Sequence, residues 1–409
     1  MKKLKIAFIV PQFPVTSQTF IVNQITDLIN RGHEVEIFSL SKGNNAIIHQ
    51  KILNNNLFEK VVYRFEKKIT SSPRVFIIKN LLQNFGYINW KRFCKKFKFF
   101  NYQTKTFDIK YYFQHWWILK KQNFDVVHAH FGHAGIFFAQ LRKLGFFHQS
   151  KFIVTFHGYD LNPSILVQLK KDYKRLFLEV DLMSVNTPYA KSLLQEITDH
   201  KKIVILPVGL NVDEFSPKIQ EPLDELNILF VGRLISLKGP DLCIEIFRLL
   251  VEKGYNNLRL IIIGEGELNN ELNGLIQKYG LATKVILTGA LTQEEIKSWM
   301  NKSALFLLPG IHDKTGRAET QGLVIQEAQA MELPVIISDV GGMKYGMLNE
   351  KTGFVVREAD IEAFVEKIEI LVLNPQLRRE MGKRGRKYVE DNYDSQILGE
   401  KLEKFYLTQ

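Results

Sequence analysis

Short apolar runs alternate with amphipathic segments along most of this chain. The first run, LKIAFIV at residues 4–10, is followed by an apolar stripe at helical spacing over residues 21–29. The alternation continues to about residue 206 and starts again with LNILFVGRL at residues 226–234. Strands that alternate with helices form parallel sheets covered by helices on both faces. The sequence therefore predicts an α/β protein with two doubly wound, Rossmann-like domains that face each other across a cleft.

The join between the two domains is predicted near PVGLNVDEFSP, residues 207–217. Proline and glycine cluster there, and the charge balance changes from basic to acidic. We therefore assign residues 1–206 to an N-terminal domain and residues 207–389 to a C-terminal domain. A single helix is predicted at about residues 165–178. The tail at about residues 360–407 is predicted to contain three helices and no strand.

Composition narrows the class of protein further. The chain has 409 residues, and its two cysteines, Cys94 and Cys243, lie far apart. Two distant cysteines provide neither a disulfide framework nor a zinc ligand set, so a reducing, cytoplasmic location is expected. We expect no membrane-spanning helix, because no run of about 18 apolar residues occurs. The basic start, MKKLKIAFIVPQFP, is interpreted as a first strand rather than a secretion signal.

Positive charge is concentrated in one part of the N-terminal domain. The net charge is +12, and residues 41–125 alone hold 17 basic and 4 acidic groups among many aromatic side chains. Lysine interleaved with Phe and Trp suits an anionic membrane surface. A helical insertion with a solvated basic face is a second interpretation. Single-stranded nucleic acid is a third, and no nucleic-acid-binding signature accompanies the charge.

Ligands of open α/β sheets bind beyond the carboxyl ends of the strands, so the residues after each strand are the candidates. Arg233 and Lys238 follow the strand that begins the second series, with glycines beside them. Two cations in a strand-to-helix loop suit a diphosphate. The alternative is a surface loop that carries stray charges.

A second loop, IIIGEGEL at residues 261–268, places Gly264 and Gly266 between a strand and a helix. It resembles the dinucleotide fingerprint, but Asn269 stands where the third glycine would be. The segment is therefore either a nucleotide-contacting turn or a plain tight turn.

The segment RAETQGLVIQEAQAMELPV, residues 317–335, carries two carboxylates around a predicted helix start. If Gly322 opens the helix, its free N–H groups and positive dipole end can hold phosphate. Glu319 then lies in the loop near a sugar, and Glu327 lies along the helix where it can accept hydrogen bonds from ribose hydroxyls. The alternative is two ordinary carboxylates on a helix surface.

Histidines follow two strands of the N-terminal domain. His157, in VTFHGYD at residues 154–160, ends a strand and can exchange hydrogen bonds or a proton near neutral pH; the alternative is a packed core histidine. His128, His130 and His133 have metal-like spacing, but Gly132 stands where an aspartate would complete a binuclear pattern. No Asp-x-Asp pair occurs in the chain, so the usual metal-diphosphate anchor of the other main sugar-transferase fold is absent.

Taken in order, these segments resemble family 4 glycosyltransferases of the GT-B fold, and within them the colanic-acid and exopolysaccharide biosynthesis enzymes. The resemblance covers nearly the whole chain. It is carried by the following motifs: FPVTSQTFIVNQITDLINRGHEVEI, DVVHAHFG, TFHGYD, PVGLNVDEFSP, VGRLISLKG, IGEGEL, LTGAL and ETQGLVIQEAQAMELPVI.

The resemblance implies a role for each candidate residue. Arg233 and Lys238 match the pair that neutralises the donor diphosphate, Glu327 matches the ribose carboxylate, and Glu319 and His157 match residues at the transferred sugar and the reacting centre. Catalysis is thus expected of His157, Glu319, Arg233 and Lys238. The donor-binding set is Arg233, Lys238, Gly264, Gly266, Glu319, Gly322, Leu323 and Glu327, and the acceptor side is Pro14, Thr16, Ser17 and Thr19. Transfer is expected to retain anomeric configuration and to need neither metal nor cofactor.

One segment departs from the family pattern. After the strand VIIS, the family shows Gly-Gly-x-Pro-Glu, whereas residues 341–345 here are GGMKY.

The family's C-terminal helix also packs back on the N-terminal domain. Residues of about 390–409 are expected to do so, with a face formed by Tyr393, Ile397, Leu402 and Phe405.

The leading hypothesis is a hexosyltransferase that uses a UDP- or GDP-linked sugar and a lipid-linked glycan acceptor in cell-surface polysaccharide biosynthesis. The basic segment would hold it on the inner face of the plasma membrane. A non-hydrolysing nucleotide-sugar epimerase and a degenerate, non-catalytic binding subunit are the alternatives, and a metallohydrolase built on the histidine cluster is a fourth.

Overall fold

The computed structural model describes most of the chain, in six stretches. They are residues 2–15, 18–43, 50–64, 115–121, 123–217 and 225–408. Thr16, Ser17, Cys94 and most of the basic segment at 41–125 lie outside the described residues.

The chain divides into two compact units. The first unit comprises Met1–Thr155 and Tyr173–Met183, and the second comprises Phe156–Asp172 and Ser184–Gln409. The described residues form two β-sheets, and the order of the strands in each is typical of doubly wound α/β proteins. The predicted fold class is confirmed.

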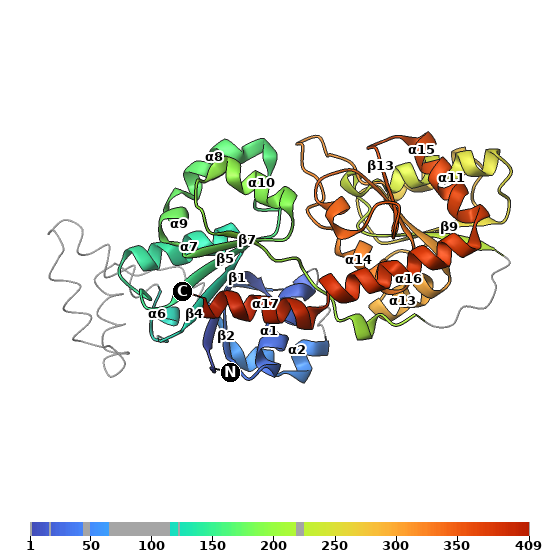
Figure 1. Ribbon diagram of the computed structural model, residues 1–409. Helices are drawn as coiled ribbons and strands as arrows, with labels where there is room; N and C mark the ends of the chain where they lie inside the picture. The colour runs from blue at the N-terminus through green and yellow to red at the C-terminus, as the bar shows by residue number, and fades with distance from the viewer. Residues whose placement is uncertain are drawn as a thin grey trace. The chain divides into compact units, whose positions relative to one another are not determined.

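The first sheet has seven strands in the order 3-2-1-4-5-6-7. Their bounds are β3 (Val61–Tyr63), β2 (Glu34–Lys42), β1 (Lys5–Phe13), β4 (Val126–His130), β5 (Lys151–Phe156), β6 (Leu182–Val185) and β7 (Ile203–Ile205). In the first unit, α1 (Thr19–Asn30) and α2 (Gln50–Asn54) lie on one side of the strands, and α7 (Gly132–Lys143) lies on the other (Figure 1). The short helix α6 (Trp116–Leu119) precedes β4.

Strand β1 extends past Pro11, where the apolar run of the sequence ends. Pairing with β2 continues to Phe13, whereas the described pairing with β4 covers only Ile6–Ile9. Pro11 has no N–H to donate, and it lies beyond the stretch in which β1 is paired on both sides. The hydroxyl of Ser41 donates to the Pro11 carbonyl at 2.9 Å, so that acceptor is satisfied.

The second sheet has six strands in the order 10-9-8-11-12-13, and every pairing in it is parallel. The strands are β10 (Val285–Leu287), β9 (Leu258–Ile263), β8 (Leu226–Val231), β11 (Ser303–Leu308), β12 (Val335–Ser338) and β13 (Gly353–Val356). Four of them are mostly buried and mostly apolar, as expected for strands covered on both faces.

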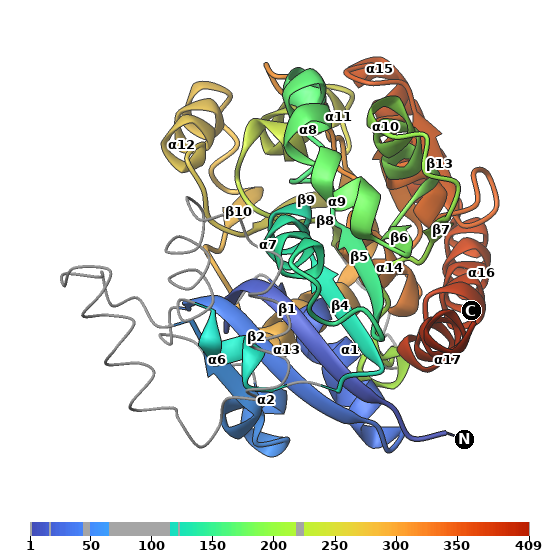
Figure 2. The same cartoon turned by 90° about the vertical axis from the view of Figure 1, so that its left-hand side faces the viewer.

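Helices cover both faces of this second sheet. Figure 1 shows α11 (Pro240–Glu252) and α15 (Ile361–Leu373) on one side, and α13 (Gln293–Asn301), α14 (Leu323–Ala330) and α16 (Pro375–Asn392) on the other. Figure 2 shows α12 (Asn269–Lys278) near the β10 edge. The start of α13 is fixed by a capping box, in which the Thr292 and Glu295 side chains bond to each other's backbone N–H.

One predicted helix is broken in two. The sequence predicted a single helix at about residues 165–178, but α8 (Leu166–Asp172) and α9 (Lys174–Glu179) are separated at Tyr173. The Tyr173 ring is fully buried, and it lies so close to Gly132 that a Cβ there would come within 2.5 Å of it.

The tail forms three helices, as predicted. The buried face of the last helix differs in part from the expected face of Tyr393, Ile397, Leu402 and Phe405. Helix α17 (Ser395–Leu407) begins only after Tyr393, because the Asp394 side chain caps it by accepting from the Gln396 N–H. Its buried residues are Leu398, Gly399, Leu402, Glu403 and Tyr406, whereas Ile397 and Phe405 are only half-buried. The packing of this helix on the N-terminal domain stays a prediction.

None of the helices in the described stretches has both the length and the apolar content needed to cross a bilayer.

Two helical glycines provide a matched test of the packing in the second unit. A Cβ on Gly382 of α16 would lie 2.0 Å from the Glu332 carbonyl oxygen, whereas a Cβ on Gly274 of α12 would meet nothing within 4 Å. We expect Gly382→Ala to lower the free energy of unfolding by about 1–3 kcal/mol through overpacking. Gly274→Ala should raise it by about 0.5–1 kcal/mol through helix propensity. Urea denaturation of both variants checks this, and shifts of the same sign would contradict the described packing.

Candidate functional site

Lys238 is positioned by the tight loop that joins β8 to α11. The loop ends in Gly239, which has φ +66° and sits where a Cβ would lie 2.1 Å from the Pro309 carbonyl oxygen. Only glycine fits such a close backbone approach, and Pro240 then starts α11 directly. Lys238 is therefore fixed at the carboxyl end of β8. Arg233, at the start of the same loop, is exposed, and no described residue forms an ion pair with it.

Lys238 forms an ion pair with Glu319, which lies in the loop between β11 and α14. The two side chains are mostly shielded, with 12% and 20% of their surface exposed. Burial raises the pKa of Glu319, but the Lys238 ammonium and the backbone N–H groups of Gln321 and Gly322 outweigh it and hold the pKa below its usual value. Glu319 is thus an anion at neutral pH.

Helix α14 begins where the sequence predicted it. Gly322 is its N-terminal cap, with φ +73°, and Leu323 is its first residue. A Cβ at Gly322 would lie 3.3 Å from the Glu319 side chain, so the loop, the cap and the carboxylate form one compact group. The helix start and Lys238 together provide a region of positive potential that suits an anionic group.

Glu327 lies one turn into α14, and its environment differs from that of Glu319. Burial raises its pKa to about 7, although the attraction of Lys238 works in the opposite direction. Lys238 therefore acts electrostatically on both glutamates, and it is paired with only one of them. The structure brings Lys238, Glu319, Gly322, Leu323 and Glu327 together, as the sequence predicted.

The turn with Gly264 and Gly266 lies against the loop that holds Arg233. A Cβ at Gly264 would lie 1.9 Å from the Gly232 carbonyl oxygen, and one at Gly266 would lie 2.3 Å from that of Leu234. The Leu234 N–H donates to the Glu265 carbonyl at 2.9 Å, which ties the two loops together. Both glycines therefore serve close backbone packing.

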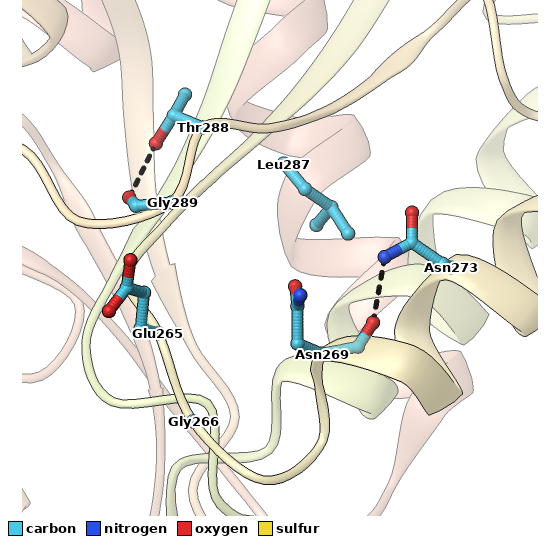
Figure 3. Close-up of a pocket in the computed structure, with 7 residues that line it drawn as sticks. All are labelled: Glu265, Gly266, Asn269, Asn273, Leu287, Thr288 and Gly289. Atoms are coloured by element: carbon cyan, nitrogen blue, oxygen red, sulfur yellow. Dashed lines mark hydrogen bonds between the residues drawn. The ribbon is translucent and has the colours of Figure 1, made fainter.

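A cavity of about 670 Å³ opens beside this turn (Figure 3). It is lined by Glu265, Gly266, Asn269, Asn273, Leu287, Thr288 and Gly289. Only Gly266 was singled out from the sequence. Asn269 and Asn273, one turn apart on α12, are joined by a bond from the Asn273 amide to the Asn269 carbonyl at 2.9 Å. In the sequence, the spacing of Asn269 and Asn273 by four residues, which places both on one helix face, could have indicated this cavity.

His157 lies in a tight turn directly after β5, and this turn belongs to the second unit. The backbone N–H groups of His157 and Gly158 both donate to the buried Asp160 carboxylate, at 2.9 and 3.0 Å. The His157 carbonyl accepts from the Thr320 hydroxyl at 3.1 Å. Burial lowers the pKa of His157 to about 3, so its imidazole is neutral at physiological pH. The structure thus places His157 beside the residue that follows Glu319.

The segment that departs from the family pattern forms a short turn, η7 (Met343–Gly346). The Gly342 N–H donates to the Glu319 carbonyl at 2.7 Å, so the turn lies next to the candidate site. Lys344 pairs with Asp339 at 2.9 Å, and the Tyr345 carbonyl accepts from the Tyr393 hydroxyl at 2.8 Å. The turn is thus anchored without a proline or a glutamate.

Two of the residues expected on the acceptor side, Pro14 and Thr19, lie in the first unit. Pro14 is buried directly after β1, and Thr19 is the first residue of α1. Thr16 and Ser17 lie outside the described residues.

Two of the three histidines with metal-like spacing are part of the core of the first unit, whereas His133 is exposed. His128 and His130 are fully buried on β4, with ring centroids 4.5 Å apart, and His128 shares a 2.6 Å hydrogen bond with the Thr155 hydroxyl. In the stretches that the structure describes, no three histidine, cysteine, aspartate or glutamate residues are grouped so that they could hold a metal ion.

Two doubly wound sheets, with Lys238, Glu319 and Glu327 grouped at the strand ends of the second, have the architecture of glycosyltransferases of the GT-B class. Known proteins agree with this assignment. The family described as Glycosyltransferase Family 4 matches residues 17–214, and that described as Glycosyl transferases group 1 matches residues 211–388. The chain belongs to glycosyltransferase family 4.

Within the family, its relatives include enzymes of bacterial exopolysaccharide synthesis. It is 30% identical to the amylovoran biosynthesis glycosyltransferase AmsK of Erwinia amylovora, over 88% of each chain. It is 29% identical to the putative colanic acid biosynthesis glycosyltransferase WcaL of Escherichia coli, over 98% of each. The fold is similar to that of sucrose-phosphate synthase from Thermosynechococcus elongatus, with a TM-score of 0.72 and 19% identity over 99% of this chain and 98% of that one.

The two glutamates near Lys238 should respond to neutralisation in opposite directions. The pKa of Glu327 is about 7 in the folded chain, whereas the ordinary pKa of a glutamate is 4.5. The free energy of unfolding therefore decreases as pH rises from 4.5 to 7, because the folded chain keeps a proton that the unfolded chain has lost. Glu327→Gln should therefore raise the free energy of unfolding by about 1–3 kcal/mol at pH 8 and leave it unchanged at pH 4.5.

Glu319→Gln should lower the free energy of unfolding at pH 8 by about 1–3 kcal/mol, because it leaves a half-buried Lys238 without its partner. That loss should shrink as pH falls below the ordinary glutamate range, where the wild-type ion pair is itself lost. Urea denaturation at pH 8 and 4.5 for Glu327→Gln, and at pH 8 and about pH 3 for Glu319→Gln, measures the four differences. Equal effects of the two substitutions would refute the assigned environments.

Proposed function

We propose that this glycosyltransferase moves a hexose, with retention of anomeric configuration, from a UDP- or GDP-linked donor to a lipid-linked glycan in cell-surface polysaccharide biosynthesis. The observation that carries the proposal is the Lys238–Glu319 ion pair at the start of α14, with Glu327 one turn away. The pair supplies one cation for a diphosphate and one carboxylate for a sugar. No cofactor is required, because the activated sugar is itself the donor.

The donor diphosphate is proposed to lie between Arg233, Lys238 and the start of α14. Two cations and a helix N-terminus stabilise the negative charge that grows on the leaving phosphate as the sugar bond breaks. The cavity beside Gly266 can receive the nucleoside. Anabaena HepE, a structural neighbour with 14% identity and a TM-score of 0.69 over 98% of this chain and 99% of that one, was solved with UDP-glucose.

Donor binding is proposed to redistribute the contacts of Lys238. Without donor, the Lys238 ammonium bonds to Glu319. A diphosphate competes for that ammonium, because its oxygens carry more negative charge than one carboxylate. Glu319 then accepts hydrogen bonds from the hydroxyls of the sugar, and Glu327 accepts from the ribose.

The chemistry proposed is attack by an acceptor hydroxyl on the face from which the nucleotide leaves. The departing phosphate oxygen takes the proton of that hydroxyl, so no protein base is needed. His157 is neutral and can hydrogen-bond to the transferred sugar without placing a positive charge beside an oxocarbenium-like centre. Retention follows because bond breaking and bond formation share one face.

The acceptor and location are proposed from charge and from relatives. The 17 basic residues at 41–125 suit the anionic inner face of the plasma membrane, where lipid carriers lie. A relative in Escherichia coli, 26% identical over 71% of this chain and 77% of its own, is named for UDP-galactose as donor and a diphosphoundecaprenol-linked acceptor. Peripheral attachment there would bring the acceptor to the enzyme.

The function is tested by incubating the purified chain with a panel of radiolabelled UDP- and GDP-sugars and lipid-linked oligosaccharides. Label in the lipid fraction, with the donor's anomeric configuration in the product by NMR, supports the proposal. A changed sugar nucleotide formed without acceptor would identify an epimerase instead. Donor binding without any turnover would identify a non-catalytic binding subunit.

Neutralising the cation pair should weaken donor binding. Lys238→Ala and Arg233→Ala should each reduce affinity for the nucleoside diphosphate about 10- to 100-fold, because each removes a charge-assisted bond. Lys383→Ala, which removes an exposed lysine from α16, is the matched control and should change nothing. Calorimetry with UDP and GDP measures the effect. Unchanged affinity in the variant that combines Arg233→Ala with Lys238→Ala would contradict the proposed donor site.

Metal removal should leave transfer intact. Arg233 and Lys238 supply the positive charge that a divalent cation supplies in other transferases. Activity in 10-fold excess EDTA over total divalent metal is expected to stay within about 2-fold of the untreated rate. A rate that collapses with EDTA and returns with Mg²⁺ or Mn²⁺ would show that a bound metal carries this charge.

A further inference from the structure

Thr320 lies between the candidate catalytic carboxylate and the start of α14, and its side chain is buried. It is 9% exposed. Its neighbour Glu319 pairs with Lys238, and Gly322, two residues later, caps the helix. All contacts of Thr320 described below lie within the second unit. Sequence patterns gave this residue no role.

The Thr320 hydroxyl is used both as donor and as acceptor. It donates to the His157 carbonyl at 3.1 Å, and it accepts from the Asn186 side-chain amide at 3.3 Å. A hydroxyl has a single proton, and the bond from Asn186 leaves that proton directed at His157. Thr320 therefore holds the backbone of the candidate catalytic histidine through an oriented bond.

The turn that carries His157 is also held sterically by Thr320. Gly158 has φ +98°, and a Cβ there would lie 2.2 Å from the Thr320 methyl carbon. The other side of the turn is fixed by Asp160, which accepts from the N–H groups of His157 and Gly158. The backbone of His157 is therefore bonded on its N–H side by Asp160 and on its carbonyl side by Thr320.

The backbone of Thr320 is itself immobilised. Its carbonyl accepts from the Thr187 hydroxyl at 2.8 Å, and a Cβ on Gly342 would lie 1.8 Å from that carbonyl oxygen. The next residue, Gln321, exchanges two bonds with the backbone of Val208, at 2.8 and 2.7 Å. Thr320 is thus a fixed point from which both the His157 turn and the Glu319 carboxylate are placed.

We propose that Thr320 is a positioning residue, which sets His157 relative to the Glu319–Lys238 pair through its hydroxyl and methyl groups. The proposal rests on the proposed transferase function for its kinetic consequence. Its structural consequence, the placement of His157, is independent of any activity. A shift of about 1 Å in a reacting group can cost a factor of about 100 in rate, so a positioning bond should be visible in kcat.

The test uses Thr320→Val, which keeps the shape but removes the hydroxyl, and Thr320→Ser, which keeps the hydroxyl. In the full chain, Thr320→Val should lower kcat about 10- to 100-fold while the donor KM changes less than about 3-fold. Thr320→Ser should retain kcat within about 3-fold of the wild type. A purely structural role would instead lower the amount of folded enzyme without separating kcat from KM.

A second measurement does not need turnover. The imidazole resonance of His157, assigned by its loss in His157→Gln, should shift in Thr320→Val and stay in place in Thr320→Ser. If Thr320→Val does not fold, Asn186→Ala takes its place, because it removes the bond that orients the hydroxyl, and it should shift the same resonance.

The outcomes separate the two proposals. A wild type without transfer to any acceptor, combined with the expected resonance shifts, would overturn the transferase function and keep Thr320 as the residue that places His157. A His157 resonance unmoved by Thr320→Val or Asn186→Ala, or a Thr320→Val enzyme with wild-type kcat, would overturn the positioning role.

Discussion

The ion pair between Lys238 and Glu319 is the interaction on which the candidate site depends. It joins the end of β8 to the loop before α14, two segments about 80 residues apart in the sequence. Because both side chains are mostly shielded from water, neither charge is well solvated without the other. The same lysine also moderates the pKa of Glu327. One cation thus lowers the pKa of two carboxylates, although burial still keeps the pKa of Glu327 at about 7.

The pair can form only because backbone segments pass unusually close to one another. Gly239 lies against Pro309, and Gly341 would place a Cβ 2.3 Å from the Glu319 carbonyl oxygen. Side chains at these points would separate the loops and move Lys238 away from Glu319. The turn GGMKY keeps this close approach although it lacks Pro-Glu, because its two glycines provide the contacts to Glu319 and Thr320. The segment that departs from the family pattern is therefore in close backbone contact with the site.

The periodicity of the sequence was sufficient to predict both sheets and the start of α14, because buried parallel strands and a glycine-capped helix leave local signals. The grouping of Lys238, Glu319 and Glu327 was predictable from the rule that ligand residues follow strands. The break at Tyr173 and the late start of α17 were not, since each depends on a burial partner or a cap that periodicity does not show. Thr320 left no signal either, because its partners His157, Asn186 and Thr187 lie more than 130 residues away.

A crystal structure of the chain with a bound UDP- or GDP-sugar would show directly whether the donor diphosphate binds Lys238 and the start of α14. Our account predicts the diphosphate at the start of α14, with the Lys238 ammonium moved from Glu319 to a phosphate oxygen and Glu319 bonded to the sugar. A diphosphate bound elsewhere, with the Lys238–Glu319 ion pair unchanged, would contradict it.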